Sequence, residues 1–413
     1  MKYDELLFQR YFDDWSKLPA DKIVSLLNVK TKTVIPSLKD IDFSKKLRVK
    51  WGIDPTGADL HIGHICSVVV INLFLKCGHH IDLVIGDFTA RIGDPSGRST
   101  ERPMLTDAEI TENMKTYKQQ IGKYIDTDKV AIRFNSEWLN KMPIQDILYI
   151  FKGLKLAAAL QREDFRTRLA KGDEVSIAEV FYASNMGFDS IALETDIEIG
   201  GIDQLLNFQQ CREIQRIKGQ KPEIIITTPL LEGTDGSGRK MGKSFGNYIA
   251  VNASAEEKFG KIMSIPDNVL MQYYKCFCYL YENEIADLEK FIETQPMEAK
   301  KQLAAYLVSI EARDLKAGLA ERDKFEKKFS KRELAEDDFE TVYSVHGSSL
   351  KDVLFSSGKF SSMGEVKRLF TSNAISDIAT LEKLNPDMPV TALIKVKCGK
   401  LTFLRIIPKE VKS

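Results

Sequence analysis

The chain has no excess of charge, because 59 Asp and Glu balance its 59 Lys and Arg. This balance excludes a globally basic, histone-like binder, although it says nothing about a local basic face. The chain also lacks a long apolar run: its most apolar segment, residues 65–71, is far shorter than the ~20 residues of a membrane helix. Residues 1–15 carry four acids and no apolar core, unlike a secretory signal. We therefore expect a cytoplasmic protein without membrane contact.

Cysteine is scarce and scattered. The six Cys form no C-x-x-C pair, so they predict neither a disulfide framework nor a zinc site. The 13 Pro and 25 Gly are too few for a collagen-like or broadly disordered chain. With 413 residues, of which 43% are apolar, the sequence predicts a globular protein of two or three domains.

The segment 47–87 has the pattern of a βαβ unit. An expected strand at 47–53 is followed by a turn, an apolar helix at 60–76 and a second strand at 81–85. Such units build parallel sheets, and their ligands bind at the carboxyl ends of the strands. A similar strand–helix–strand pattern at 197–228 predicts the other half of the sheet. The fold class is therefore expected to be α/β, with a Rossmann-like parallel sheet.

Other changes in pattern divide the chain into segments. Residues from about 100 to 190 are rich in helix-forming and charged residues, which predicts a helical insertion between the two halves of the sheet. A polar break near residues 331–338 ends a second helical stretch. We expect an N-terminal helical extension at 1–45, a catalytic domain at 46–250, a helical domain at 251–332 and a small α+β module at 333–413.

A first motif, His61-Ile62-Gly63-His64, stands at the expected start of the helix in the βαβ unit. Two imidazoles three residues apart, together with helix amide groups and a glycine that lets a ligand approach, form an anion site. In the alternative reading, one His caps the helix and the other packs against it. That reading suits a lone His better than this pair.

A second motif, Lys240-Met241-Gly242-Lys243-Ser244, lies in a glycine-rich segment after a strand. Two lysines on a loop can close over a polyphosphate and neutralise the charge that develops on leaving pyrophosphate. A solvated basic loop is the alternative if the motif stands alone. A P-loop is excluded because its first glycine would fall at position 237, where the chain has Ser237.

Taken together, the two motifs resemble the paired HIGH and KMSKS signatures of class I aminoacyl-tRNA synthetases. The segments 86–98, 182–189 and 200–204 look like those of the tyrosyl-tRNA synthetase family, in its bacterial branch with a compact tail. Cytidylyltransferases also carry the first motif, but they do not share these segments. The resemblance covers residues 45–270 well.

The resemblance implies further domains and partners. It implies an anticodon-binding type of helical domain at 251–332 and an S4-like module within 333–413. The expected substrates are tyrosine or a close analogue, tRNA, and ATP with its Mg²⁺, and no dedicated protein metal site is expected. A homodimer is also implied, with a surface in the insertion where the available apolar residues include Leu148, Ile150, Phe151 and Leu154.

The resemblance also assigns roles to single residues. The catalytic set comprises His61, His64, Lys240, Lys243 and Ser244. The ATP-binding set comprises Gly52, Asp54, Thr56, Gly63, Gly201 and Asp203. The amino-acid-binding set comprises Thr89, Asp94, Tyr182, Met186, Asp189 and Gln204, with Asp189 reading the phenol. A substrate carboxylate is already a nucleophile, so its attack on ATP requires positioning and charge stabilisation rather than a general base.

Several positions depart from the family pattern. Met186 stands where the family has a glutamine that reads the ammonium group, Ile202 replaces a small hydroxyl residue, and Leu205 is more apolar than expected. Gly242 replaces a serine of the lysine motif. These changes favour, as an alternative, a specialised paralogue that activates a tyrosine-like amino acid. A third hypothesis is a non-catalytic RNA-binding protein on a synthetase scaffold, against which the retained His and Lys residues argue.

Overall fold

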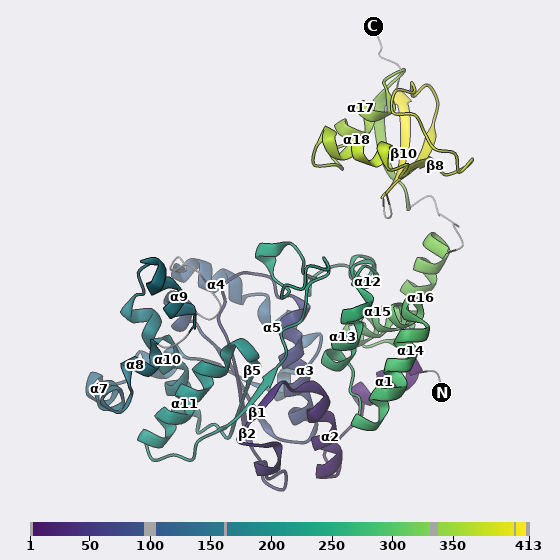
Figure 1. The fold of residues 1–413 in the computed structure, drawn as a ribbon. Helices are drawn as coiled ribbons and strands as arrows, with labels where there is room; N and C mark the ends of the chain where they lie inside the picture. Colours follow the sequence, from purple (N-terminus) through teal and green to yellow (C-terminus); the bar gives the residue numbers. More distant parts are fainter. Residues whose placement is uncertain (1–2, 95–104, 161–162, 331–337, 400–401, 410–413) are drawn as a thin grey trace. The chain divides into compact units, whose positions relative to one another are not determined.

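The computed structural model describes residues 3–94, 105–160, 163–330, 338–399 and 402–409. The contacts divide the chain into two compact units, residues 1–322 and 323–413. Figure 1 shows a sheet surrounded by helices in the first unit and a small mixed fold in the second. The finer division into four segments stays a prediction.

A six-stranded sheet forms the centre of the first unit, with the strand order β1-β6-β5-β2-β3-β4. All neighbouring strands are parallel except β1, which runs antiparallel to β6 at one edge. The strands are β1 (Thr33–Ile35), β2 (Arg48–Ile53), β3 (His80–Ile85), β4 (Ala131–Phe134), β5 (Ile197–Gly201) and β6 (Ile224–Thr228). The parallel sheet expected from the sequence is confirmed, with β2 and β5 side by side at its centre.

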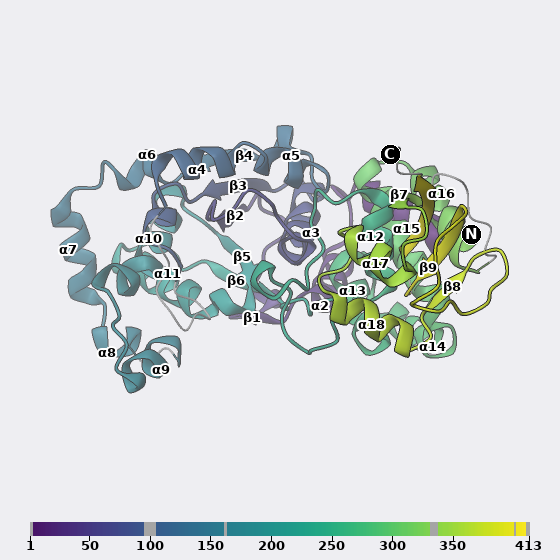
Figure 2. The ribbon, with the colours of Figure 1, turned by 90° about the horizontal axis from the view of Figure 1, so that it is seen from above.

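Helices cover both faces of this sheet. Figure 2 shows α3 (Ile62–Lys76) on one side of the strands and α10 (Ile177–Leu193) with α11 (Leu205–Ile217) on the other. Successive side chains of a strand point to opposite faces. Trp51 of β2 accordingly lines a small cavity together with Val68 of α3, whereas the ammonium group of Lys50 contacts α10. Burial on both faces explains the nearly continuous apolar strands.

Two strands escaped the sequence analysis. The N-terminal segment contains α1 (Tyr3–Phe12) and α2 (Ala20–Lys30) as expected of a helical extension, but it also supplies β1 to the sheet. The insertion likewise supplies β4, which pairs with β3. Both are short strands at the edges of the sheet, where an alternating pattern has too few residues to be recognised.

The rest of the insertion is helical. It contains α4 (Asp107–Met114), α5 (Tyr117–Gly122), α6 (Ser136–Leu139), α7 (Ile144–Gly153), α8 (Leu156–Ala159) and α9 (Glu163–Lys171). Ile150 of α7 is fully buried in a cluster with Phe188 of α10 and Ile214 of α11. Its expected place on a dimer surface is therefore wrong, because the packing of α7 against α10 and α11 covers it.

Helices after residue 250 complete the first unit. They are α12 (Ala255–Met263), α13 (Leu270–Phe277), α14 (Ile285–Thr294), α15 (Pro296–Ala312) and α16 (Leu315–Phe325). Helix α15 packs against α1, α12, α13 and α14, and most of its middle is buried. The hydroxyls of buried Tyr274 and Tyr306 donate to main-chain carbonyls, which satisfies these polar groups inside the core.

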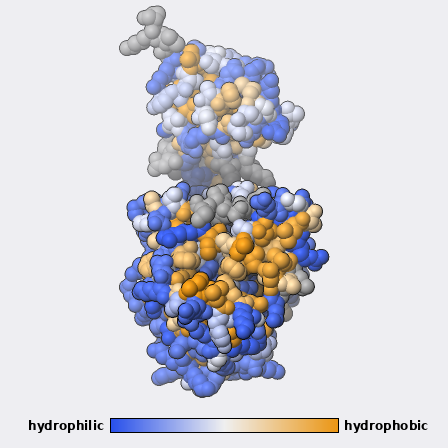
Figure 3. All heavy atoms as spheres, turned by 90° about the vertical axis from the view of Figure 1, so that its left-hand side faces the viewer, coloured by the Kyte–Doolittle hydropathy of each residue, from blue (hydrophilic) through white to orange (hydrophobic). Residues whose placement is uncertain are grey.

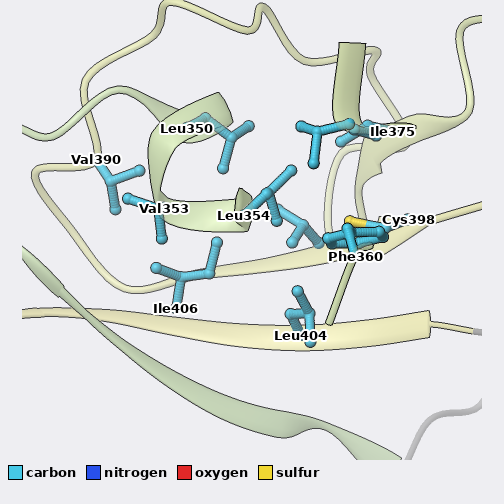
Figure 4. Packing of buried hydrophobic residues seen from close by; sticks show 11 residues of the cluster. Leu350, Val353, Leu354, Phe360, Ile375, Val390, Cys398, Leu404 and Ile406 are labelled. Atoms are coloured by element: carbon cyan, nitrogen blue, oxygen red, sulfur yellow. The ribbon is translucent and has the colours of Figure 1, made fainter. Parts of the chain in front are cut away.

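The second unit folds around its own core. Its sheet has the order β7-β10-β9-β8, made by β7 (Glu340–Val345), β8 (Ile375–Asp377), β9 (Ile394–Cys398) and β10 (Thr402–Lys409). Helices α17 (Leu350–Ser356) and α18 (Met363–Thr371) pack against it. Figure 4 shows Leu350, Val353 and Leu354 of α17 lying over Leu404 and Ile406 of β10. The small mixed module expected from the sequence is present.

No helix in the part of the chain that the structure describes has the length and apolar character required to span a membrane.

Candidate active site

A large cavity lies at the carboxyl ends of the parallel strands. Its volume is about 830 Å³, and its lining comes from segments that are far apart in the sequence. Every residue of the expected catalytic, ATP-binding and amino-acid-binding sets lines this cavity: Gly52, Asp54, Thr56, His61, Gly63, His64, Thr89, Asp94, Tyr182, Met186, Asp189, Gly201, Asp203, Gln204, Lys240, Lys243 and Ser244. The fold thus brings the predicted residues together, while their individual roles stay predictions.

The two histidines form a close pair at the start of α3. Their ring centroids are 3.9 Å apart, and the main-chain N–H of His61 donates to Nδ1 of His64 over 3.2 Å. Nδ1 of His64 also lies 3.2 Å from the carbonyl oxygen of His61, so either ring nitrogen of a neutral His64 can carry the proton. Burial lowers the pKa of His64 to about 4, and burial lowers the pKa of His61 still further. Both rings are therefore neutral at physiological pH, and a neutral imidazole has one N–H donor.

Gly63 makes this arrangement possible. A Cβ atom at this position would lie 2.9 Å from Nδ1 of His61, closer than real side chains approach. The absence of a side chain lets the His61 ring lie against the first turn of α3. The glycine of the motif is thus required by the histidine pair as well as by any ligand that approaches the helix.

The lysine motif folds back onto the histidine pair. The main-chain N–H of Met241 donates to the carbonyl of Leu231 over 2.7 Å, and the buried Met241 side chain packs beside Gly63. The positive charges of Lys240 and Lys243 contribute to the lowered pKa of His61. The two motifs, which are far apart in the sequence, therefore share one electrostatic environment.

Each lysine of the motif reaches a different part of the cavity wall. Nζ of Lys240 lies 3.2 Å from Oδ2 of Asp203, which follows β5. Lys243 reaches the turn after β2, because a Cβ atom at Gly57 would lie 3.0 Å from its Nζ. The two cations therefore reach the segments that follow two neighbouring strands, β5 and β2, and both line the cavity.

Asp54 links the expected ATP and amino-acid residues. Its two carboxylate oxygens accept hydrogen bonds from Oγ1 of Thr89 over 2.7 Å and from the hydroxyl of Tyr182 over 2.9 Å. Both donors belong to the expected amino-acid set, whereas the sequence analysis placed Asp54 in the ATP set. Nearby, Nε2 of Gln204 donates to Oδ2 of Asp94 over 2.7 Å. Two carboxylates are thus held ready for a cationic group.

Tyr182, Met186 and Asp189 lie on one face of α10, as their spacing predicts, and all three line the cavity. Oδ1 of Asp189 accepts a hydrogen bond from Nε1 of Trp138 over 2.8 Å. Burial raises the pKa of Asp189 to about 7, although Lys50 and Trp138 oppose this shift. The carboxyl group therefore titrates near neutrality and can accept a hydrogen bond from a ligand hydroxyl.

Comparison with known proteins agrees with this geometry. Residues 43–325 match the model of the family described as class I tRNA synthetases (W and Y). The tyrosine–tRNA ligase of Carboxydothermus hydrogenoformans is 40% identical over 383 residues, covering 89% of this chain and 92% of that protein. The corresponding ligase of Thermotoga maritima is 38% identical over 371 residues, with the same two coverages, 89% and 92%. The chain belongs to the class I tRNA synthetases.

Solved structures share the fold of this synthetase. A C-terminally truncated mitochondrial tyrosyl-tRNA synthetase from Aspergillus nidulans has a TM-score of 0.62 at 21% identity, covering 79% of this chain and 99% of that one. The tyrosyl-tRNA synthetase from Archaeoglobus fulgidus, crystallised with L-tyrosine, has a TM-score of 0.60 at 21% identity, covering 74% and 100%. At this identity the likeness supports the class I synthetase fold.

Two buried charged residues of the synthetase cavity were missed by the sequence analysis. Lys50 of β2 and Glu198 of β5 are almost completely buried, line the cavity and form an ion pair of 2.8 Å. A signal was present in the sequence, since each charge interrupts an apolar strand: Lys50 lies between Val49 and Trp51, and Glu198 lies between two isoleucines. A single charge in a short strand is usually read as a solvent-facing residue.

The same region contains the one group of possible metal ligands among the described residues. Ligand atoms of Glu198, Cys211 and Glu223 lie within 4.8 Å of one another, and all three residues are buried. The ammonium group of Lys50 already neutralises Glu198. Burial and the neighbouring Glu198 raise the pKa of Glu223 well above its usual range. The direction of this shift favours the uncharged form of Glu223 beside the ion pair of Lys50 and Glu198.

Proposed function

We propose that this synthetase activates tyrosine with ATP, forms tyrosyl-adenylate and transfers the tyrosyl group to the 3′ end of its tRNA. The observation that carries the proposal is the cavity itself, in which the two phosphate-binding motifs and the buried Asp189 line one space. The similarity to tyrosine–tRNA ligases over 89% of the chain supports it. A purely RNA-binding protein would have no physical need for the buried histidine pair and the two lysines.

The proposed roles follow from the contacts. The carboxylates of Asp54 and Asp94 bind the ammonium group of the amino acid, whose ring reaches Asp189. ATP brings its Mg²⁺ and lies over Gly52 and the histidine pair, with Gly201 and Asp203 at the ribose. The neutral N–H groups of the histidines and the charges of Lys240 and Lys243 stabilise the negative charge on the leaving pyrophosphate, and this charge is greatest in the transition state.

A second candidate is a paralogue for a tyrosine-like amino acid, favoured by one observation. Met186 lines the cavity on the same face of α10 as Tyr182 and Asp189, so a thioether stands where the family has an amide. Pyrophosphate exchange with a panel of aromatic amino acids and ring-substituted tyrosines separates the candidates. Exchange that is strongest with tyrosine supports the first proposal, and exchange that is strongest with an analogue supports the second. Absence of exchange with every amino acid refutes both.

We also propose that a second copy of the chain covers an apolar face of the first unit. Figure 3 views the molecule from the side of α7 and α8 and shows apolar side chains gathered there. Ile144, Leu148 and Tyr149 of α7 are each about three-fifths exposed, as is Leu156 of α8, and Ile177 at the start of α10 is 73% exposed. Such a contiguous apolar surface is typical of an interface.

Light scattering tests this dimer. The wild-type protein should have twice the mass of the chain at micromolar concentration, and Leu148→Lys should shift it toward a single copy. Leu381→Lys is the matched control, because Leu381 is similarly exposed but lies in the second unit. A wild-type protein with the mass of one chain would refute the proposal.

The RNA partner is proposed to contact the second unit, while the helices after residue 250 read the anticodon end. Residues 396, 398, 404 and 406 of β9 and β10 face the core, so Lys395, Lys397 and Arg405 lie on the other face of the sheet. Lys395 and Lys397 lie over the rings of Phe339 and Phe403. Replacing these three cations by Ala should weaken tRNA binding and reduce its salt dependence, with pyrophosphate exchange unchanged. Unchanged tRNA affinity would refute this assignment.

A further inference from the structure

Four ionisable residues meet under the amino-acid part of the cavity. We call Lys50, Asp189, Glu198 and Glu223 the ring-end cluster. Lys50 and Glu198 are direct neighbours in the register of β2 and β5, so their side chains leave the same face of the sheet, toward α10. Their exposed fractions are 2% and 1%, and both line the cavity together with Asp189. Glu223 is buried behind them and does not line the cavity.

Lys50 is fully engaged by its neighbours. An ammonium group has three N–H donors. The three acceptors of Lys50 are the main-chain oxygen of Met186 at 3.0 Å, Oγ of Ser190 at 2.6 Å and Oε1 of Glu198 at 2.8 Å. Lys50 thus has no donor left for a ligand, and its ammonium group fixes Glu198 between the sheet and α10.

Glu198, in contrast to Lys50, can accept further hydrogen bonds. A carboxylate can accept about four hydrogen bonds. Apart from the ion pair with Lys50, neither of its oxygens receives a hydrogen bond from the hydroxyl, amide or amine groups of the described residues. The single proton of Glu223 can fill one further position at most. At least one acceptor position of a cavity-lining, buried carboxylate therefore remains for a bound molecule.

We propose that Glu198 is a specificity-determining residue of the amino-acid pocket, a second acceptor for the ring hydroxyl beside Asp189, and that Lys50 is the positioning residue that holds it there. This inference rests on the proposed function and deepens it. A tyrosine-type ring brings a hydroxyl group to the two carboxylates. Phenylalanine would occupy the same space without a hydroxyl group. The acceptor positions that Trp138 and Lys50 do not fill would then stay unpaired, which is costly for buried charged acceptors.

A role in recognition also explains why the protein contains the buried ion pair of Lys50 and Glu198. A buried ion pair is weak evidence for stability, because well-packed apolar residues are often as stable. The ion pair lies on a cavity wall, where all donors of Lys50 are used but some acceptor positions of Glu198 are not. This arrangement is suited to recognition of a ligand. The ammonium group of Lys50, 2.8 Å from Oε1 of Glu198, supplies the opposite charge that a buried carboxylate requires.

Pyrophosphate exchange by the full-length Glu198→Gln variant, with tyrosine and with phenylalanine, tests the proposal. We expect kcat/KM for tyrosine to fall roughly ten-fold or more, mainly through KM, while kcat/KM for phenylalanine is unchanged or rises. The ratio of the two values should therefore fall. A merely structural role would lower both values together, so an unchanged ratio would overturn the inference.

Glu223→Gln is the matched control from the same cluster. The raised pKa of Glu223 favours its uncharged form, which an amide closely resembles. The ratio of the two kcat/KM values for Glu223→Gln should therefore equal that of the wild type. If Glu198→Gln fails to fold because it leaves Lys50 without its partner, the double variant Lys50→Gln/Glu198→Gln removes both charges and must show the same loss of discrimination. Wild-type protein without exchange for any aromatic amino acid would instead refute the proposed function.

Discussion

Gly52, the next-to-last residue of β2, gives a direct test of where ATP lies. A Cβ atom at this position would meet no protein atom within 4 Å, and the residue has ordinary strand geometry. Gly52→Ala should therefore fold normally. Because alanine restricts the unfolded chain more than glycine does, the variant should be more stable by about 0.4–1 kcal/mol.

The effect on catalysis should be the opposite. If the nucleotide lies against the backbone of Gly52, a methyl group intrudes on it and costs about 1–3 kcal/mol, as overpacking does in a filled site. This corresponds to a KM for ATP that is roughly five-fold to 150-fold higher. The assay is pyrophosphate exchange at saturating tyrosine with varied ATP, combined with urea unfolding of the same protein. A stable Gly52→Ala protein with an unchanged KM for ATP would refute the placement of ATP.

Gly86 supplies the contrasting control. A Cβ atom there would lie 2.0 Å from Oδ1 of Asp54 and 2.3 Å from Oγ1 of Thr89. Gly86→Ala must therefore disturb the carboxylate of Asp54 even before a substrate binds. We expect Gly86→Ala to be less stable and to bind both tyrosine and ATP more weakly. Gly52→Ala should weaken the binding of ATP alone.

The remaining predictions concern single side chains of the cavity. Lys243→Ala should lower the single-turnover rate of adenylate formation by roughly 10²-fold with little change in tyrosine affinity, and a change in tyrosine KM alone would contradict the loop assignment. Met186→Gln should strengthen tyrosine binding in isothermal titration by about 1–2 kcal/mol if the added amide reaches the ammonium group. Burial raises the pKa of Asp189 to about 7 in the folded protein. The contribution of Asp189 to the free energy of unfolding therefore becomes less favourable as pH rises from about 4, its pKa in the unfolded chain, to about 7. In urea unfolding, Asp189→Asn should thus gain about 1–3 kcal/mol relative to wild type between pH 5 and pH 7, and parallel pH profiles would contradict this.

The sequence predicted the central strands because each carries a strong local signal. Strands β2, β3 and β6 are apolar runs that end at turn residues, and the observed bounds differ from the expected ones by only a residue or so. The edge strands β1 and β4 were missed because their three and four residues are too few to establish a period. Their position depends on pairing with β6 and β3, which is a tertiary property.

The residues of the site were predicted from motifs, and the residues that this prediction missed show what motifs omit. The histidine and lysine residues were found because their types and spacing carry chemistry. Lys50 and Glu198 were missed because their significance arises only when β2 and β5 become neighbours. Ile150 shows the opposite kind of error, because it was assigned a role that the structure contradicts. In the sequence analysis it was named for a dimer surface, but α10 and α11 cover it.

The neighbouring positions of β2 and β5 in the sheet also affect how the protein folds. β2 and β3 are joined by one short crossover, but the main-chain N–H of Arg48 in β2 bonds to Asp196, 148 residues further along the chain. Contacts between such distant residues form slowly, because a long loop must close first. The wall formed by β5 and α11 is thus expected to join β2 later than β3 does, and the cavity is incomplete before that. During refolding, helical circular dichroism should return before exchange activity, so that activity reports a late step of folding.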